Sequence, residues 1–123
     1  MAGSIRVRAG LSGLLAIVLL AACGSDGPPL VEGVVKPVDV LDNAFRPGEI
    51  EVAAGTEVVW ENRGRSDHDV LPVEGNAWGV DADHFKPGDV FRYRFTEPGT
   101  FAYYCSLHGT TGKGMVGTIV VTG

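Results

Sequence analysis

The sequence predicts an all-β domain, folded as an antiparallel Greek-key sandwich of about seven or eight strands. Short runs of β-branched and aromatic residues follow one another along the chain, and Pro-Gly pairs separate several of them. No stretch keeps a helical period of apolar residues over three turns. The 123 residues leave room for one domain, since about 100 residues bury a single sandwich core and little more.

The pattern of residues along the chain predicts where each strand lies. Phe91, Tyr93 and Phe95 fall on one face of a run whose other face carries arginines, which is typical of a half-buried strand. Pro37 places the first run at an edge or a bulge, because proline cannot donate a ladder hydrogen bond. Residues 75–84 are expected to be irregular or weakly helical. The strands are expected at 34–41, 50–53, 56–61, 70–73, 90–95, 100–105 and 117–122.

The N-terminus predicts export. Two arginines precede an apolar run at 11–22, which is shorter than the roughly 20 residues that a spanning helix needs. Residues 1–22 are therefore expected to be a secretory signal. The ending Leu20-Ala-Ala-Cys23 resembles the bacterial lipobox. That resemblance implies cleavage before Cys23, lipidation of its sulfur and anchoring on the outer face of the cell membrane, the periplasmic or cell-surface side. The alternative is an ordinary secreted protein with an unmodified Cys23.

After the signal, the sequence predicts a tether and then the folded domain. Residues 23–33 are rich in Gly and Pro and are expected to be flexible, and residues 34–123 are the predicted domain. Without Arg6 and Arg8, eight Lys and Arg residues remain against 15 Asp and Glu residues, a formal charge of −7. An acidic surface argues against nucleic acid and is compatible with a basic protein partner.

The two cysteines allow two interpretations. In an exported protein, the default is a disulfide between Cys23 and Cys105. If Cys23 is lipidated, however, Cys105 is left alone in an oxidising compartment. A free thiol there needs a metal or a catalytic role to explain it.

The stretch from Cys105 to Met115 contains a thiol, an imidazole and a thioether. Copper accepts all three, since thiolate and thioether suit Cu(I) and imidazole suits both oxidation states. A second imidazole is expected from upstream. His68 is preferred because a β-run follows it, whereas His84 lies beside acidic residues before a turn, as solvated histidines do. The predicted copper ligands are therefore His68, Cys105, His108 and Met115.

The predicted mature chain resembles the plastocyanin/azurin family of blue copper proteins over nearly all of its length, and four segments carry the resemblance. The resemblance implies a cupredoxin fold in which a Cys, a His and a Met come from the last loop between strands and one His comes from an upstream loop. The segments are Asn43-Ala-Phe45-Arg-Pro47-Gly, Val58-Val-Trp60-Glu-Asn62, Ser66-Asp-His68-Asp69 and Pro98-Gly-Thr-Phe101-Ala-Tyr103-Tyr-Cys105.

The sequence differs from the family's pattern in two places. Plastocyanins usually have four residues between the His and the Met of this loop, whereas six separate His108 from Met115. The glycines among them are expected to make the loop flexible enough for Met115 to reach the metal; the alternative is a core methionine at a strand entrance. Family members often have Asn after the upstream His. Here Asp69 is expected to bond to Ser106, join the two loops and lower the potential through its charge.

The resemblance implies one-electron transfer at a type 1 copper site, in a monomer that is not an enzyme. It also implies that the edge of His108 is the electron port, and that the partners are redox proteins such as cytochromes or a terminal oxidase. Three alternatives remain open: copper delivery or storage with the same ligands, catalysis at an open copper position, and a metal-free adhesion module with a Cys23–Cys105 disulfide.

Overall fold

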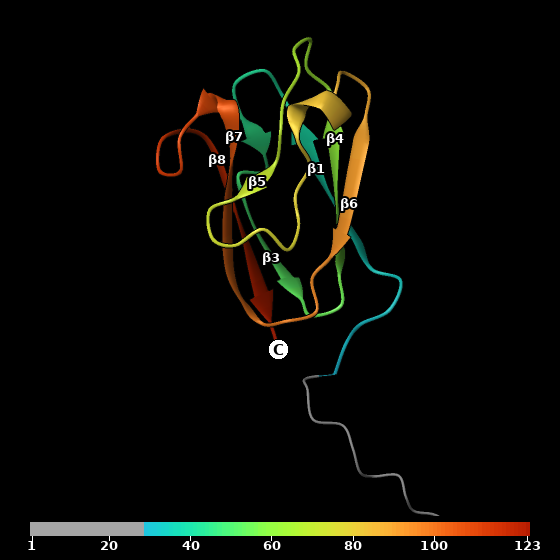
Figure 1. Cartoon of the computed structure of the whole chain (residues 1–123). Helices are drawn as coiled ribbons and strands as arrows, with labels where there is room; N and C mark the ends of the chain where they lie inside the picture. Colours follow the sequence, from blue (N-terminus) through green and yellow to red (C-terminus); the bar gives the residue numbers. More distant parts are fainter. Residues whose placement is uncertain (1–28) are drawn as a thin grey trace, which may run out of the picture.

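The computed structural model describes residues 29–123, which form two sheets packed face to face (Figure 1). One sheet has the strand order β2-β1-β4-β6 and the other β3-β8-β7-β5. This arrangement confirms the predicted all-β sandwich. The elements are β1 (Val35–Val40), β2 (Phe45–Arg46), β3 (Glu49–Ala53), β4 (Glu57–Asn62), β5 (Leu71–Pro72), the 3-10 turn η1 (Ala82–His84), β6 (Val90–Arg94), β7 (Gly99–Gly109) and β8 (Gly114–Thr122).

Two strand pairs run parallel, so the prediction of a wholly antiparallel sandwich is wrong in this respect. β1 pairs with β4 in parallel, and β3 pairs with β8 in the same way. Between β1 and β4 the chain passes through β3, which belongs to the other sheet. A connection of this length lets two strands run parallel, whereas a hairpin does not. Apolar residues alternate in the same way in parallel and antiparallel strands, so the sequence pattern did not distinguish the two kinds of pairing.

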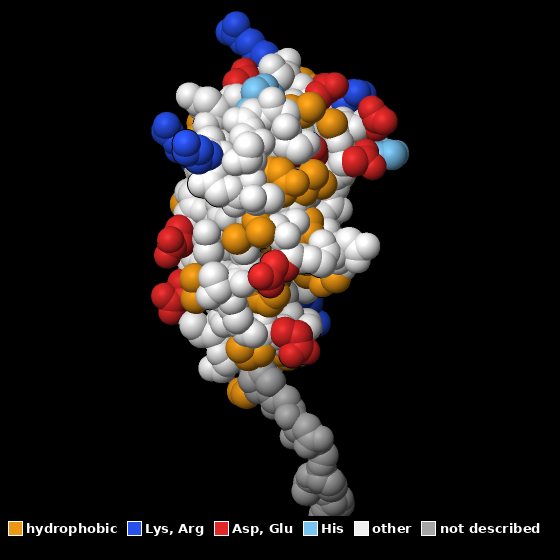
Figure 2. Space-filling view, turned by 60° about the vertical axis from the view of Figure 1, so that its left-hand side comes forward, with side chains coloured by type: hydrophobic (Ala, Val, Ile, Leu, Met, Phe, Trp, Pro, Cys, Tyr) orange, Lys and Arg blue, Asp and Glu red, His pale blue; other side chains and the backbone are white. Residues whose placement is uncertain are grey.

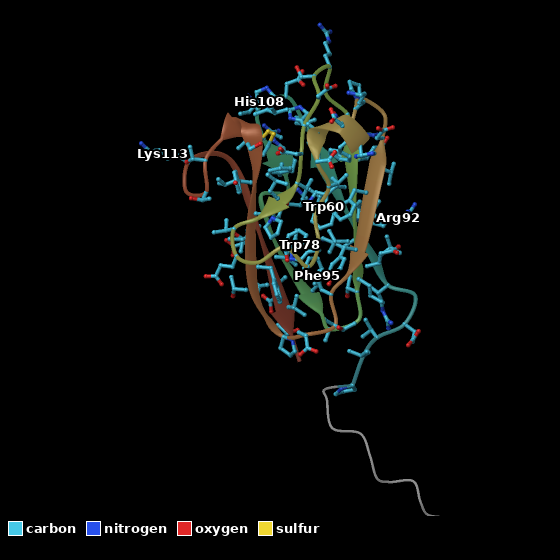
Figure 3. The ribbon with its side chains drawn as sticks, in the orientation of Figure 1. Trp60, Trp78, Arg92, Phe95, His108 and Lys113 are labelled. Atoms are coloured by element: carbon cyan, nitrogen blue, oxygen red, sulfur yellow. The ribbon has the colours of Figure 1, made fainter. Side chains whose placement is uncertain are left out.

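Alternating burial along the strands builds the core between the sheets. In β4, every second side chain is buried. Trp60 lies at the centre of this core, stacked on Trp78 at 5.7 Å between ring centroids and in edge contact with Tyr103 at 5.6 Å. Figure 3 shows the two tryptophans below the end of the sandwich that carries His108. The aromatic core thus supports that end and fills the space beneath it.

The last two strands are longer than predicted. β7 continues through Cys105 and His108, with a shift of register between Tyr104 and Gly109 that marks a bulge. Gly109 then pairs with Gly114, the first residue of β8. Cys105 and His108 therefore lie on the bulged strand β7, and Met115 lies on β8, whereas an open loop was expected to carry all three.

Only residues 110–113 turn between these strands, and the backbone nitrogen of Thr110 donates to the carbonyl of Lys113 at 2.8 Å. A Cβ on Gly109 would lie 2.5 Å from the backbone nitrogen of Met115, so glycine is what lets the strands close here. Residues 110–113 form a protruding tip, which carries Lys113 (Figure 3). The position of Met115 is thereby set by strand pairing.

The N-terminal part of the described chain lies against the domain. Val31 donates its backbone N–H to the carbonyl of Ala54 at 2.9 Å, and Arg94 donates to the carbonyl of Val31 at 3.1 Å. The chain enters at the end of the sandwich opposite to His108 (Figures 1 and 3). Within residues 29–123, no helix is long and apolar enough to cross a membrane. The predicted signal, Cys23 and most of the predicted tether lie outside the described residues.

Candidate metal centre

Three of the predicted ligands meet at one end of the sandwich. His68 lies in the segment between β4 and β5, whereas Cys105 and His108 lie on β7. The Sγ atom of Cys105 is 3.5 Å from Nδ1 of His68 and 3.7 Å from Nδ1 of His108. The donor atoms of these three residues all lie within 4.8 Å of one another. A metal ion placed among them would therefore meet two imidazoles and one thiol.

His68 has a fully buried side chain, and its segment is held by the end of β4. Asn62, the last residue of β4, donates its side-chain amide to the carbonyls of Ser66 and Phe85, each at 3.0 Å. Its side-chain oxygen accepts the backbone N–H of Gly64 at 3.0 Å. These bonds close the turn that precedes His68. The backbone N–H of His68 also points to the carbonyl of Phe85, at 3.4 Å.

Asp42, in the turn between β1 and β2, holds the same segment from the other side. Its Oδ1 accepts the backbone N–H groups of Arg65 at 2.9 Å and Ser66 at 3.1 Å, and it lies 3.1 Å from Nε2 of His68. The N–H of Arg65, followed by His68 and Ser66, lowers the pKa of Asp42 to about 2. Asp42 was not predicted from the sequence, because a single Asp in a turn looks like a solvated loop residue.

Cys105 is a buried, free cysteine. Burial raises the pKa of its thiol above the ordinary value. Binding a metal as thiolate therefore requires the loss of a proton from a closed site.

Asp69 and Ser106 connect the two segments that carry the predicted ligands. Asp69 follows His68 and is buried, while Ser106 follows Cys105. Oδ1 of Asp69 accepts the backbone N–H of Ser106 at 2.7 Å, and Oδ2 accepts the hydroxyl of Ser106 at 2.5 Å. Two charge-assisted bonds of this kind keep the segments in register with each other.

His108 differs from His68 in being exposed, beside Leu107, a residue that is 52% exposed. The rings of the two histidines are 4.7 Å apart between centroids. Met115 lies at the start of β8 and is 1% exposed. The structure thus places His108 at the surface and Met115 in the interior.

His84 does not belong to this group. It lies in η1, exposed to solvent, and its Nδ1 is 2.7 Å from Oδ1 of Asp81. This hydrogen bond raises the pKa of His84 and lowers that of Asp81. Among residues 29–123, His68, Cys105 and His108 form the one cluster of His, Cys, Asp or Glu side chains suited to a metal ion.

The donor chemistry of this end fits copper. Two imidazoles and a thiol, with a buried thioether on the neighbouring strand, combine borderline and soft donors that suit both Cu(I) and Cu(II). A structural zinc site is usually closed by four Cys or His ligands, and the cluster found here has three.

The chain matches one protein family over almost all of the described domain. Residues 34–122 match the copper binding proteins of the plastocyanin/azurin family. Plastocyanin from Cucurbita pepo is 36% identical over 88 residues, which cover 63% of this chain and 87% of that protein. The plastocyanin minor isoform of Arabidopsis thaliana is 30% identical over 119 residues, which cover 89% of this chain and 68% of that protein.

Solved structures share the fold as well. A reduced amicyanin mutant aligns with a TM-score of 0.61 and 29% identity, covering 73% of this chain and 83% of its own. A Cu-containing nitrite reductase from Thermus scotoductus aligns with a TM-score of 0.63 and 25% identity, but only over 25% of its own chain. With the family match and the donor cluster, these likenesses show that the chain belongs to the plastocyanin/azurin family of copper binding proteins and is a cupredoxin, a copper protein of electron transfer.

Proposed function

We propose that His68, Cys105, His108 and Met115 hold a single copper ion in a type 1 site. The observation that carries this assignment is the convergence of two imidazole nitrogens on one buried thiol, at 3.5 and 3.7 Å. Bound copper would supply a one-electron step between Cu(I) and Cu(II). Met115 would be the fourth and weakest donor, because it is the buried thioether at the start of the strand paired with β7.

In this proposal, the protein's part is to hold the donors in place before and after an electron moves. His68 and Cys105 are closed off from water, and Asp69 links their segments through Ser106. A donor group held this way rearranges little when the charge of the metal changes, which favours fast electron transfer. His108 is the exposed ligand, so electrons pass to and from a partner through its ring.

Asp69 is proposed to lower the reduction potential, since its charge lies near the thiolate and favours Cu(II). The Asp69→Asn variant keeps an oxygen that can accept the N–H of Ser106 and loses the charge. A redox titration is expected to show a higher potential in this variant. An unchanged potential would remove this part of the proposal.

We propose that the protein is exported and anchored by lipid on Cys23. The described chain enters at the end opposite to His108 (Figure 3), so an anchor at Cys23 would leave the His108 end accessible to partners. Mass spectrometry of the N-terminal peptide is expected to find a diacylglyceryl group on Cys23. The Cys23→Ala variant should then leave the membrane fraction, whereas an unmodified Cys23 would support ordinary secretion.

The proposed partners are redox proteins such as cytochromes or a terminal oxidase, met by a monomer through a small and short-lived contact. The exposed Leu107 offers an apolar point of contact beside His108. On the face drawn in Figure 2, acidic side chains lie along the body of the molecule and also toward its upper end, where most of the visible Lys and Arg side chains lie. We propose no enzyme activity, because the nitrite reductase is matched over only a quarter of its chain.

Visible and EPR spectra of the soluble domain after addition of Cu(II) test the proposed function. A type 1 site is expected to give an intense blue thiolate charge-transfer band and a narrow parallel hyperfine splitting. Both should disappear in the Cys105→Ser variant and remain in the His84→Ala control. A pale product with ordinary hyperfine splitting would instead favour copper delivery or catalysis at an open position.

A further inference from the structure

Asp42 makes a contact that the proposed electron transfer does not yet use. The two ring nitrogens of His68 face different groups: Nδ1 faces Sγ of Cys105 at 3.5 Å, and Nε2 faces Oδ1 of Asp42 at 3.1 Å. Asp42 lies in the β1–β2 turn, 26 residues before the histidine. The far nitrogen of this predicted ligand therefore has a partner of its own, from a separate part of the chain.

This contact determines which nitrogen of His68 carries the proton. Both oxygens of Asp42 already accept a backbone N–H, that of Arg65 at 2.9 Å to Oδ1 and at 3.1 Å to Oδ2, and Oδ1 also accepts that of Ser66. A carboxylate in this position can only accept from the ring, so Nε2 is the donor. Nδ1 is then left with a free lone pair, directed toward the thiol and the metal position.

The local backbone is shaped around this contact. Gly64 lies against the carboxylate, and a Cβ at this position would come 2.2 Å from Oδ1 of Asp42 and 3.1 Å from Nε2 of His68. Any residue other than glycine would therefore displace the carboxylate from the ring. Because His68 has no exposed surface, its ring also has little room to turn and exchange its two nitrogens.

We propose that Asp42 is a positioning residue that orients His68 for copper, keeps its Nε2 tautomer, and makes the imidazole a stronger donor to Cu(II). This rests on the proposed role of His68 as a ligand. A carboxylate on the far nitrogen gives the ring partial imidazolate character, which raises its basicity toward the metal. Asp42 therefore acts on the potential through His68, whereas Asp69 acts on the Cys105 side.

Three variants separate these effects. Asp42→Asn keeps an acceptor oxygen for the ring and loses the charge, and Asp42→Ala loses both. Asp39→Asn is the matched control: Asp39 lies on β1, carries the same charge, and pairs with Arg63 at the surface at 3.4 Å. Each variant of the domain is measured twice. Nitrogen-15 NMR determines the tautomer of His68 before copper is added, and a redox titration after copper is added gives the reduction potential.

We expect the metal-free wild type and Asp42→Asn to hold His68 in the Nε2–H form, and Asp42→Ala to show a mixture of tautomers. In Asp42→Asn, the Cu(II) affinity should fall about tenfold relative to the Cu(I) affinity, which raises the potential of a one-electron couple by about 59 mV. Asp39→Asn should shift the potential much less.

Two results would overturn the proposal: an Nδ1–H tautomer in the metal-free wild type, or equal potential shifts in Asp42→Asn and Asp39→Asn. If Asp42→Ala does not fold, the comparison of the two Asn variants still decides the question. The NMR measurement needs no metal, so a wild type without type 1 spectra would disprove the proposed function and leave the result on the tautomer standing.

Discussion

The two histidines that face Cys105 are held in different ways. His68 lies in a segment outside the strands, yet it is completely buried and fixed from several sides, by Asp42 at Nε2 and by Asn62 through the turn before it. His108 lies on β7, takes its place from the pairing of β7 with β8, and is exposed. One histidine is therefore fixed by side-chain bonds between distant parts of the chain, and the other by the ladder of a hairpin.

This contrast separates two tasks that a metal ligand of an electron carrier must perform. In the proposed copper site, the buried, bonded ring of His68 keeps the donors rigid, while the exposed ring of His108 is the proposed path of electrons to and from a partner. The buried contacts are also the more vulnerable, because the removal of one partner leaves others unsatisfied in a closed space. Changes near His68 should therefore affect stability and site geometry together, whereas changes near the hairpin tip should affect neither strongly.

The largest difference is expected when each histidine is replaced by glycine and imidazole is supplied from solution. In His108→Gly, the opening faces water, so added imidazole should enter and restore the blue colour. In His68→Gly, the space is closed, so the colour should not return, and the cavity and lost bonds should destabilise the domain by about 2–4 kcal/mol. Absorbance titrations and urea unfolding measure the two effects; equal rescue of both variants would contradict the contrast.

The next effect comes from a pair of glycines, one in each region. In Gly64→Ala, the new Cβ meets Oδ1 of Asp42 at 2.2 Å, and the loss of the carboxylate's bonds should cost about 1–3 kcal/mol. In Gly112→Ala, at the hairpin tip, the new Cβ has nothing within 4 Å. The control should stay within about 0.5 kcal/mol of the wild type.

Urea unfolding of the metal-free domains gives these stabilities, and the copper spectra show whether the site changes with them. Gly64→Ala is also expected to broaden or shift the charge-transfer band. If the two alanine variants proved equally stable, the segment before His68 would not be as tightly held as its contacts indicate.

A smaller effect is expected when the hairpin tip is shortened. Residues 110–113 lie beyond the Gly109–Gly114 pair, so their replacement by Asn-Gly, which favours a two-residue hairpin turn, should leave Met115 in place. The visible spectrum and the reduction potential should match those of the wild type. A changed spectrum would mean that the tip itself, and not the strand pair below it, positions Met115.

The smallest effect is expected at a surface ion pair that lies next to the residues holding the His68 segment. Asp81, the N-cap of η1, pairs with His84 at its end, next to Phe85, whose carbonyl accepts from Asn62. The pKa of Asp81 is lowered from its ordinary value of 3.8, and that of His84 is raised from 6.5. The Asp81 contribution is present above pH 3.8 and is lost as the pH falls through its lower folded value. The His84 contribution is present below pH 6.5 and is lost as the pH rises through its higher folded value.

Both partners are charged between these values, so the pair stabilises the domain most in that window. Asp81→Asn should be slightly less stable than the wild type near pH 5, and the difference should shrink toward pH 8. Thermal unfolding at the two pH values measures it. A difference that grows with pH would show that the pair acts in another way.

Much of this molecule could be predicted from local patterns. Alternating apolar residues and turn signals predicted the all-β sandwich, because burial of one face of a strand requires that alternation. The spacing of Cys105, His108 and Met115, together with His68, predicted a copper site, since the softness of the donors is a property of the residues themselves.

Tertiary structure decided what local patterns do not contain. The parallel pairing of β1 with β4 and of β3 with β8 depends on which sheet the intervening chain joins. The Gly109–Gly114 pair turned an expected loop into strand, because the backbone approach that it needs appears only once β7 and β8 lie side by side. Asp42 gained its contact with His68 in the same way. A contact between side chains 26 residues apart depends on the folded path of the backbone. The sequence around an aspartate in a turn does not indicate such a contact.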